Sequence, residues 1–238
     1  MKEDQEKRSG LMSEFSLQCS SCKKSSPLCT STSVTKRGTS YDVNRRAVYF
    51  SIETGSGYES LLSFCSIMNM PCMSKTAYYK QVDNILEALE DEAEEQMKKA
   101  GERLRQHILN ENPSKSKDET LEAAVSFDGT WAKRGFTSLT GVVFVISVDT
   151  GEILDYHVIS KTCKKCEMKK VKCDNDDEFQ EWLLEHHDCD INFAGSSPAM
   201  ESEGAVVMWK RSVERHNLQY KWMVSDGDSK AFSAVENI

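Results

Sequence analysis

Apolar residues in the second half of the chain form short runs that are typical of β-strands. Three such runs follow one another closely, at Ala124–Phe127, Leu139–Val148 and Ile153–Ser160. The sequence Asp-Thr-Gly at 149–151 separates the last two, and Asp and Gly accept the backbone angles that a tight reversal needs. The pattern therefore predicts an antiparallel meander of three strands, with Asp128 directly after the first strand.

A helix and a fourth strand are expected after this meander. Apolar residues recur at helical spacing in Pro198–Asn217, and the short apolar run Tyr220–Val224 leads into Asp226. The order strand, strand, strand, helix, strand is the ribonuclease H-like arrangement, an α/β fold with a mixed sheet whose first and fourth strands are neighbours. Asp128 and Asp226 would then meet at one metal site, although a single Asp after a strand is usually a turn residue. Asp228 is the alternative to Asp226.

Residues 44–110 are predicted to form a helical domain. Glu59–Met68 has apolar positions at helical spacing, and the Asn-Met-Pro sequence that follows ends this helix. The hydroxyl of Ser74 can cap a second helix that continues to about Leu109 with an apolar stripe and an acidic face. The pair suits a helix-turn-helix unit that binds DNA, and equally a small bundle that supports the rest of the protein. Residues 111–123 are the expected linker.

The beginning of the chain is polar and basic. Residues 1–46 contain nine Lys or Arg and five Asp or Glu, a local net charge of +4 (9 − 5), whereas the whole chain carries −8. We expect residues 1–43 to be a weakly ordered lead-in, and we expect this basic part to make the DNA contacts. Cys19-x-x-Cys22 with Cys29 nearby resembles half of a zinc knuckle, and unliganded surface cysteines are the other interpretation.

A second group of candidate metal ligands lies in an insertion at 161–192, after the third strand. The candidate ligands are Cys163, Cys166, His186 and Cys189, with His187 and Cys173 as alternatives. Two pairs about twenty residues apart suit a closed structural zinc site. The other interpretation is an unliganded insertion with a few exposed thiols. Six lysines surround the first pair, either as a contact for phosphate or as ordinary solvated surface.

Composition limits the class of protein. The chain has 238 residues, 39% of them hydrophobic, which is enough for one core and a smaller satellite domain. No apolar run reaches the length of a membrane span and no charged-then-apolar leader opens the chain, so we expect a soluble, non-secreted protein with no membrane partner. Its nine cysteines are then expected to be reduced, some of them bound to zinc.

Three motifs carry a resemblance to a known family. They are DGTW at 128–131, GSSPAME at 195–201 and SDGDSK at 225–230. The sequence resembles the Mutator-like transposases of animal genomes, most closely over Val125–Ile238. The resemblance implies a nuclear DNA transposase of the DDE class that acts on transposon ends, either alone or as a homo-oligomer. It also implies that the acids at 128 and 226 are catalytic and bind Mg²⁺ or Mn²⁺.

The sequence departs from the family pattern at the third acid. These transposases use a Glu on a later helix, and Glu236 follows Asp226 too closely to match it. We therefore expect an N-terminal fragment of a longer gene product, with an incomplete ribonuclease H-like core at 124–238, and whether this chain is itself an enzyme stays open. The alternative is a non-catalytic remnant, or a host-adopted module, that binds DNA or protein and retains the transposase fold.

Overall fold

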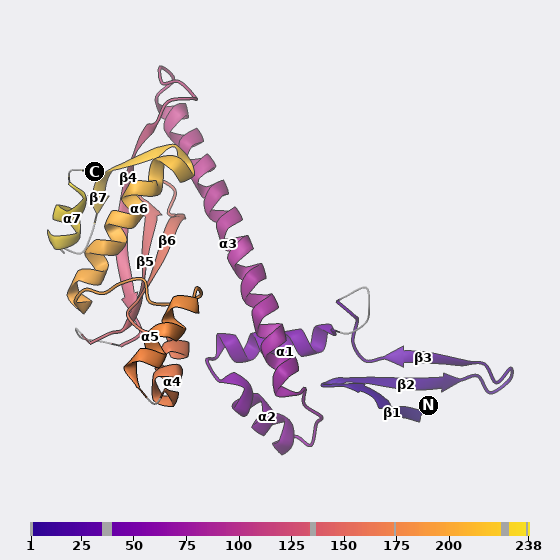
Figure 1. The fold of residues 1–238 in the computed structure, drawn as a ribbon. Helices are drawn as coiled ribbons and strands as arrows, with labels where there is room; N and C mark the ends of the chain where they lie inside the picture. The colour runs from indigo at the N-terminus through magenta and orange to yellow at the C-terminus, as the bar shows by residue number, and fades with distance from the viewer. Residues whose placement is uncertain (1, 35–39, 134–136, 174, 225–228, 237) are drawn as a thin grey trace. The chain divides into compact units, whose positions relative to one another are not determined.

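The protein is a mixed α/β protein with two β-sheets (Figure 1). The computed structural model describes residues 2–34, 40–133, 137–173, 175–224, 229–236 and 238. The chain divides into two compact units, Met1–Ala93 and Glu94–Ile238. In the described parts of the chain, no helix is long and apolar enough to cross a membrane.

The first unit begins with a three-stranded antiparallel sheet. Its strands, in spatial order, are β1 (Lys2–Ser9), β2 (Met12–Gln18) and β3 (Ser25–Cys29). We expected a weakly ordered lead-in here, and the structure instead shows regular strands. The signal that sequence analysis overlooked is the alternation of Phe15 and Leu17 with polar neighbours, which is the period of a strand.

Helices α1 (Asp42–Glu53), α2 (Gly57–Ile67) and the start of α3 (Lys75–Glu111) complete the first unit. Their shared core consists of Val48, Leu61, Cys65, Met73, Tyr78 and Ile85. The cap predicted for α3 is confirmed, because the Ser74 hydroxyl accepts a hydrogen bond from the Ala77 backbone N–H at 3.2 Å. Sequence analysis missed α1.

The boundary between the units falls inside α3 and not at the linker expected at 111–123. The second half of α3 carries Ala100, Leu104 and Ile108, and all three are buried in the core of the second unit. An apolar stripe shows that a helix packs on something, but it does not show on which core each turn packs. For this reason one continuous helix could be predicted from the sequence, whereas its division could not.

A four-stranded mixed sheet forms the centre of the second unit. Its strands are β4 (Leu121–Trp131), β5 (Thr140–Ser147), β6 (Ile153–Ser160) and β7 (Leu218–Val224). The spatial order is β6-β5-β4-β7, with antiparallel pairs β6–β5 and β5–β4 and a parallel pair β4–β7. The predicted meander is therefore confirmed. β4 is longer than predicted, so Asp128 lies within the strand and not at its end.

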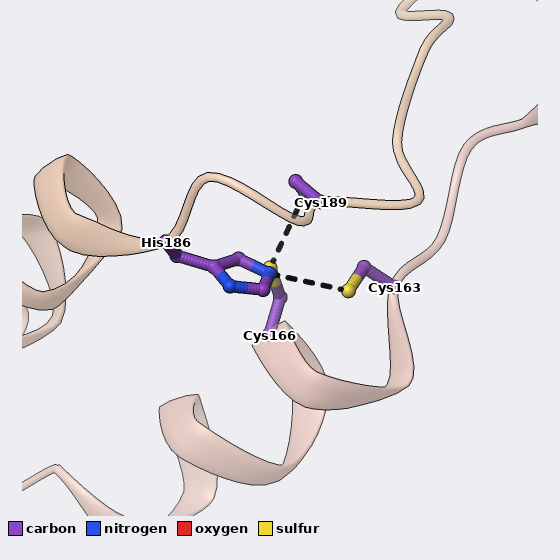
Figure 2. Close-up of side chains that lie close together, drawn as sticks. All are labelled: Cys163, Cys166, His186 and Cys189. Atoms are coloured by element: carbon purple, nitrogen blue, oxygen red, sulfur yellow. Dashed lines mark hydrogen bonds between the residues drawn. The ribbon is translucent and has the colours of Figure 1, made fainter. Parts of the chain in front are cut away.

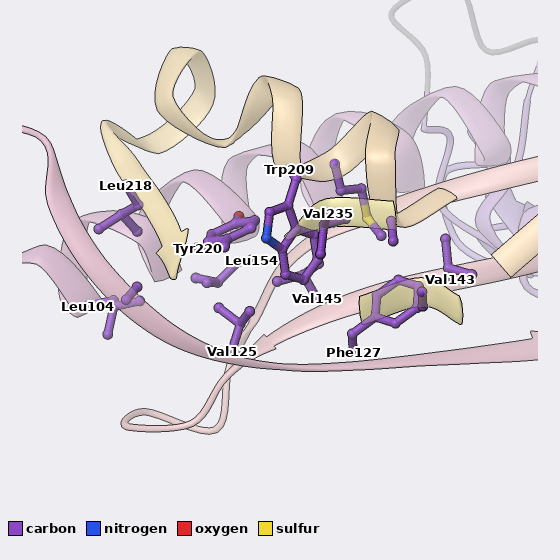
Figure 3. Packing of buried hydrophobic residues seen from close by; sticks show 14 of the residues in the cluster. Leu104, Val125, Phe127, Val143, Val145, Leu154, Trp209, Leu218, Tyr220 and Val235 are labelled. Atoms are coloured by element: carbon purple, nitrogen blue, oxygen red, sulfur yellow. The ribbon is translucent and has the colours of Figure 1, made fainter. Parts of the chain in front are cut away.

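Helix α6 (Met200–His216) covers the buried face of this sheet (Figure 3). Trp209 of α6 makes edge-to-face contacts with Phe127 of β4 and Tyr220 of β7, with ring centroids 6.0 and 5.3 Å apart. At Gly204 the helix lies so close to the sheet that an added Cβ would be 2.5 Å from Val143 Cγ2. The following helix, α7 (Ser229–Val235), contributes two further buried side chains to the same core.

A buried carboxylate connects α6 to the edge of the sheet. Asp155 of β6 is completely buried. Its carboxylate accepts hydrogen bonds from Arg211 Nε at 2.7 Å, Arg211 Nη2 at 2.8 Å and Arg215 Nη1 at 2.7 Å. A charge removed from water in this way is tolerated only when it is paired, so this contact holds α6 and β6 in one relative position.

We expect Asp155→Ala to lower the free energy of unfolding by about 3 kcal/mol or more, because it removes the buried carboxylate that two partly buried guanidinium groups share and leaves Arg215 only its pair with Glu94. Urea denaturation monitored by circular dichroism measures this. The matched control is Glu152→Gln, which removes a carboxylate from an exposed ion pair with Arg103 and should cost far less. Equal losses in the two variants would contradict the role given to Asp155.

A buried histidine predicts a second property of this core. His216 Nε2 lies 2.9 Å from the carbonyl oxygen of Leu154, and the ring packs so closely on Gly101 of α3 that an added Cβ would be 2.3 Å from Nδ1. Burial lowers the pKa of His216 below its ordinary 6.5, and burial also lowers the pKa of His157. The folded protein therefore disfavours the protonated form of His216 relative to the unfolded chain.

Stability should decrease in mild acid. Below about pH 6.5 the unfolded chain takes up protons that the folded protein excludes, so the free energy of unfolding falls as the pH falls. We expect urea denaturation to give a lower value at pH 5 than at pH 7, and a shallower decrease for His216→Gln. His107→Gln, at an exposed position of α3, is the control and should keep the decrease seen in the unchanged protein. Parallel decreases for all three proteins would count against this interpretation.

Candidate metal centre

The insertion between β6 and α6 contains two short helices that position four candidate ligands. Cys163 precedes α4 (Lys164–Lys172) and Cys166 lies in its first turn, so both thiols lie on one side of the helix start. The second helix is α5 (Asp176–Glu185). The side chain of Asn175 caps its N-terminus by accepting a hydrogen bond from the Glu178 backbone N–H at 2.9 Å. His186 ends α5 and Cys189 follows in the next loop.

The ligand atoms of Cys163, Cys166, His186 and Cys189 point toward one another and lie within 4.8 Å of each other (Figure 2). Cys163 Sγ is 3.5 Å from His186 Nε2, and Cys166 Sγ is 3.6 Å from Cys189 Sγ. A tetrahedral zinc ion, about 2.3 Å from sulfur and about 2.0 Å from nitrogen, would hold S and S about 3.8 Å apart and S and N about 3.5 Å apart. The group can therefore bind a metal ion such as zinc.

The surroundings shift the pKa values of Cys163 and Cys166 in opposite directions. Backbone N–H groups of Asp190 and Cys166, together with His186, lower the pKa of Cys163 to about 6, which favours the thiolate that binds metals. Burial raises the pKa of Cys166 to about 12, which favours the protonated thiol at neutral pH. The His186 ring stacks on Trp182, with ring centroids 4.4 Å apart, and this contact fixes its orientation.

The structure separates the predicted ligands from their alternatives. It brings together the four main candidates, whereas His187 and Cys173 are not part of the group. Sequence analysis did not identify Trp182 as a supporting residue, although its position four residues before His186 on a helix was a usable signal.

The three cysteines at the start of the chain, which were expected to form half of a zinc knuckle, do not lie close together. Cys19 and Cys22 lie in the turn that follows Gln18, the last residue of β2. Cys29 is paired with Glu14, which is four residues away from Gln18 along β2. Four residues of a strand span about 13 Å, which is too far for one metal ion. Among the described residues, only the group in the insertion has the proximity of a metal site.

The second predicted site contains Asp128 of β4. Its side chain is exposed, and its Oδ1 accepts a hydrogen bond from the Gly129 backbone N–H at 2.7 Å. The parallel neighbour β7 ends at Val224, which is paired with Ser126, so Asp128 is two residues beyond the last position of β4 that pairs with β7. Asp226 and Asp228 lie outside the described residues.

The glycine and the tryptophan of the DGTW motif have a packing explanation. Trp131 is paired with Gly141 of β5, and an added Cβ at Gly141 would lie 2.0 Å from Trp131 Cε3. An added Cβ at Gly129 would be 3.1 Å from Trp131 Cζ2. Two glycines thus leave the space in which the indole ring covers the backbone next to Asp128.

The second unit is therefore a mixed-sheet α/β domain with an exposed carboxylate on its central strand and a Cys₃His group in an insertion. Comparison with known families gives a specific result: the model of the Mutator-like transposase family matches residues 1–238, the whole chain. The protein belongs to the Mutator-like transposases. No curated protein and no solved structure matches it.

We expect protein purified without chelator to contain about one zinc per chain, and Cys163→Ser with Cys166→Ser to release it. Elemental analysis measures the metal content, and a chelator should lower the melting temperature because metal binding contributes folding free energy. Cys173→Ser and His187→Gln are matched controls that should retain the zinc, since neither side chain belongs to the group. Well-folded protein without zinc would contradict the assignment.

Proposed function

We propose that the second unit is a ribonuclease H-like core that performs metal-dependent DNA transposition, with phosphodiester hydrolysis followed by strand transfer at transposon ends. Family membership supports the substrate class. The strand order β6-β5-β4-β7, with β4 and β7 parallel, supports the fold, because this arrangement places the first and fourth strands of the unit side by side. Such a protein is expected to act in the nucleus, where its DNA is.

The observation that carries the proposal is the register of β4 and β7. Ser126 and Val224 form the last pair between β4 and β7, and Asp128 and Asp226 each come two positions later in the sequence. We infer that these carboxylates hold Mg²⁺ or Mn²⁺, which when bound activates the attacking oxygen and neutralises the leaving oxygen. In this proposal the chain contributes the two carboxylates that hold the metal.

The Cys₃His group has a different role in this proposal. Its four protein ligands would complete the coordination of a zinc ion, and a closed site of this kind stabilises structure and leaves no position for substrate. We assign the zinc to the folding of α4 and α5, and the catalytic metal to the carboxylates. A third acid is not assigned: Glu236 follows α7 directly, and Glu201 lies in the first turn of α6, where the helix dipole explains an acid.

Asp128→Asn should lower both the affinity for Mn²⁺ and the rate of metal-dependent cleavage of a transposon-end duplex. Each loss should exceed the roughly 10–100-fold that is typical when a residue that only hydrogen-bonds to a metal ligand is replaced. Titration calorimetry measures the affinity, which we expect to be millimolar, since a Mg²⁺-type site with two carboxylates relies on water for its other ligands. The matched control is Glu122→Gln, an acid of the same strand that pairs with Lys221.

Two outcomes would redirect the proposal. Mn²⁺ affinity that is unchanged in Asp128→Asn would refute the carboxylate site. Binding of DNA by the unchanged protein without any Mn²⁺ site would favour a non-catalytic DNA-binding module of the same family.

A further inference from the structure

Helix α4 has an inner face and an outer face that carry different side chains. Its inner face carries Cys166 of the metal centre and Lys170, whose Nζ lies 5.9 Å from the centre of the Phe179 ring of α5. The outer face is one stripe along the helix, because residues three, four and seven positions apart lie on the same side. Its members are Lys164, Lys165, Met168, Val171 and Lys172, which we call the α4 stripe.

All five side chains of the α4 stripe are exposed, and Val171 is 87% exposed. Within the described part of the chain, none of its three lysines has a carboxylate partner. The other charges of this helix are engaged: Lys169 pairs with Glu178 at 2.9 Å, and Glu167 accepts a hydrogen bond from the Thr162 hydroxyl. Among the described residues, the stripe therefore presents three lysines without a carboxylate partner around two apolar side chains.

This concentration of positive charge is unusual for the chain. Residues 161–172 contain six lysines and one glutamate, a net charge of +5 (6 − 1), although the whole protein carries −8. The first turn of α5 has the opposite character, with Asp176, Asp177 and Glu178. An acidic protein that binds a polyanion must do so through a local basic surface, because repulsion opposes binding elsewhere.

The dimensions of the α4 stripe fit duplex DNA. Lys164 and Lys172 are eight residues apart, which is about 12 Å along a helix. One DNA strand carries a phosphate about every 3.4 Å along the axis, so this length spans three to four phosphates, and it also matches the roughly 12 Å width of the major groove. Met168 and Val171 lie between the lysines, where they can contact sugars or thymine methyl groups.

We propose that the α4 stripe is a DNA-contact surface, and that the metal centre holds α4 in position for this contact through Cys163 and Cys166. The inference rests on the proposed function for its choice of partner: DNA is the substrate of the transposase family to which the chain belongs. It goes beyond that function because it places a duplex contact on residues of the insertion, which are distinct from the carboxylates proposed to hold the catalytic metal.

The test uses the full chain with zinc and a fluorescently labelled 20-base-pair duplex of random sequence, with binding followed by anisotropy at several salt concentrations. We expect the triple variant K164Q K165Q K172Q to bind at least about tenfold more weakly at 100 mM salt. The slope of log K against log salt should fall by about two to three, since each phosphate contact contributes about 0.9. K164R K165R K172R should retain both affinity and slope.

The control variant K80Q K98Q K99Q removes three exposed lysines of α3 and changes the net charge by the same amount. It should bind like the unchanged protein. Equal losses in the two glutamine variants would show a non-specific charge effect and overturn the inference, as would full binding by the α4 variant. Retained duplex binding with lost binding of a poly-glutamate peptide would assign the stripe to an acidic protein partner instead.

The readout is separate from that of the carboxylate site. The α4 variant should bind Mn²⁺ with the affinity of the unchanged protein while it loses DNA. If the α4 variant binds the duplex like the unchanged protein and the Mn²⁺ site is intact, only this inference is rejected. Absence of duplex binding by the unchanged protein rejects both the stripe and the proposed action on DNA.

Discussion

The pairing of the buried Asp155 carboxylate with Arg211 and Arg215 is the contact on which the second unit depends. Removing a carboxylate from water is so unfavourable that the two guanidinium groups of α6 must lie against β6 in nearly one geometry. With α6 held in this way, Gly204 contacts the sheet and Trp209 lies against both β4 and β7. The parallel placement of β7 next to β4, and hence the setting of Asp128, follows from this packing.

The insertion is attached to the same framework by a short set of polar contacts. Asn192 returns to the end of β6, where its side chain accepts a hydrogen bond from the Ser160 backbone N–H at 2.8 Å and donates one to the Val158 carbonyl at 2.7 Å. The chain thus leaves and re-enters the sheet at one point. The metal centre can consequently form from residues of the insertion alone, without altering the core beneath α6.

Local signals predicted much of this arrangement. The Cys-x-x-Cys spacing, the Ser74 cap and the turn at 149–151 each depend on residues within one or two turns of each other, so their chemistry can be recognised without a fold. The strands at the start of the chain were missed because charged and polar residues fill their surfaces. β4 was predicted too short because an exposed acid inside a strand resembles a strand end.

The amino-acid sequence alone determined the family, the strand meander and the four main candidate ligands. Only the tertiary structure decided between near-equivalent residues and between distant partners. His186 and His187 are neighbours with the same chemistry, and the stacking on Trp182 together with the 3.5 Å approach of Cys163 selects the first. Likewise, α3 is one apolar-striped helix in sequence, but its second half belongs to the second unit, because packing depends on contacts between residues far apart in the chain.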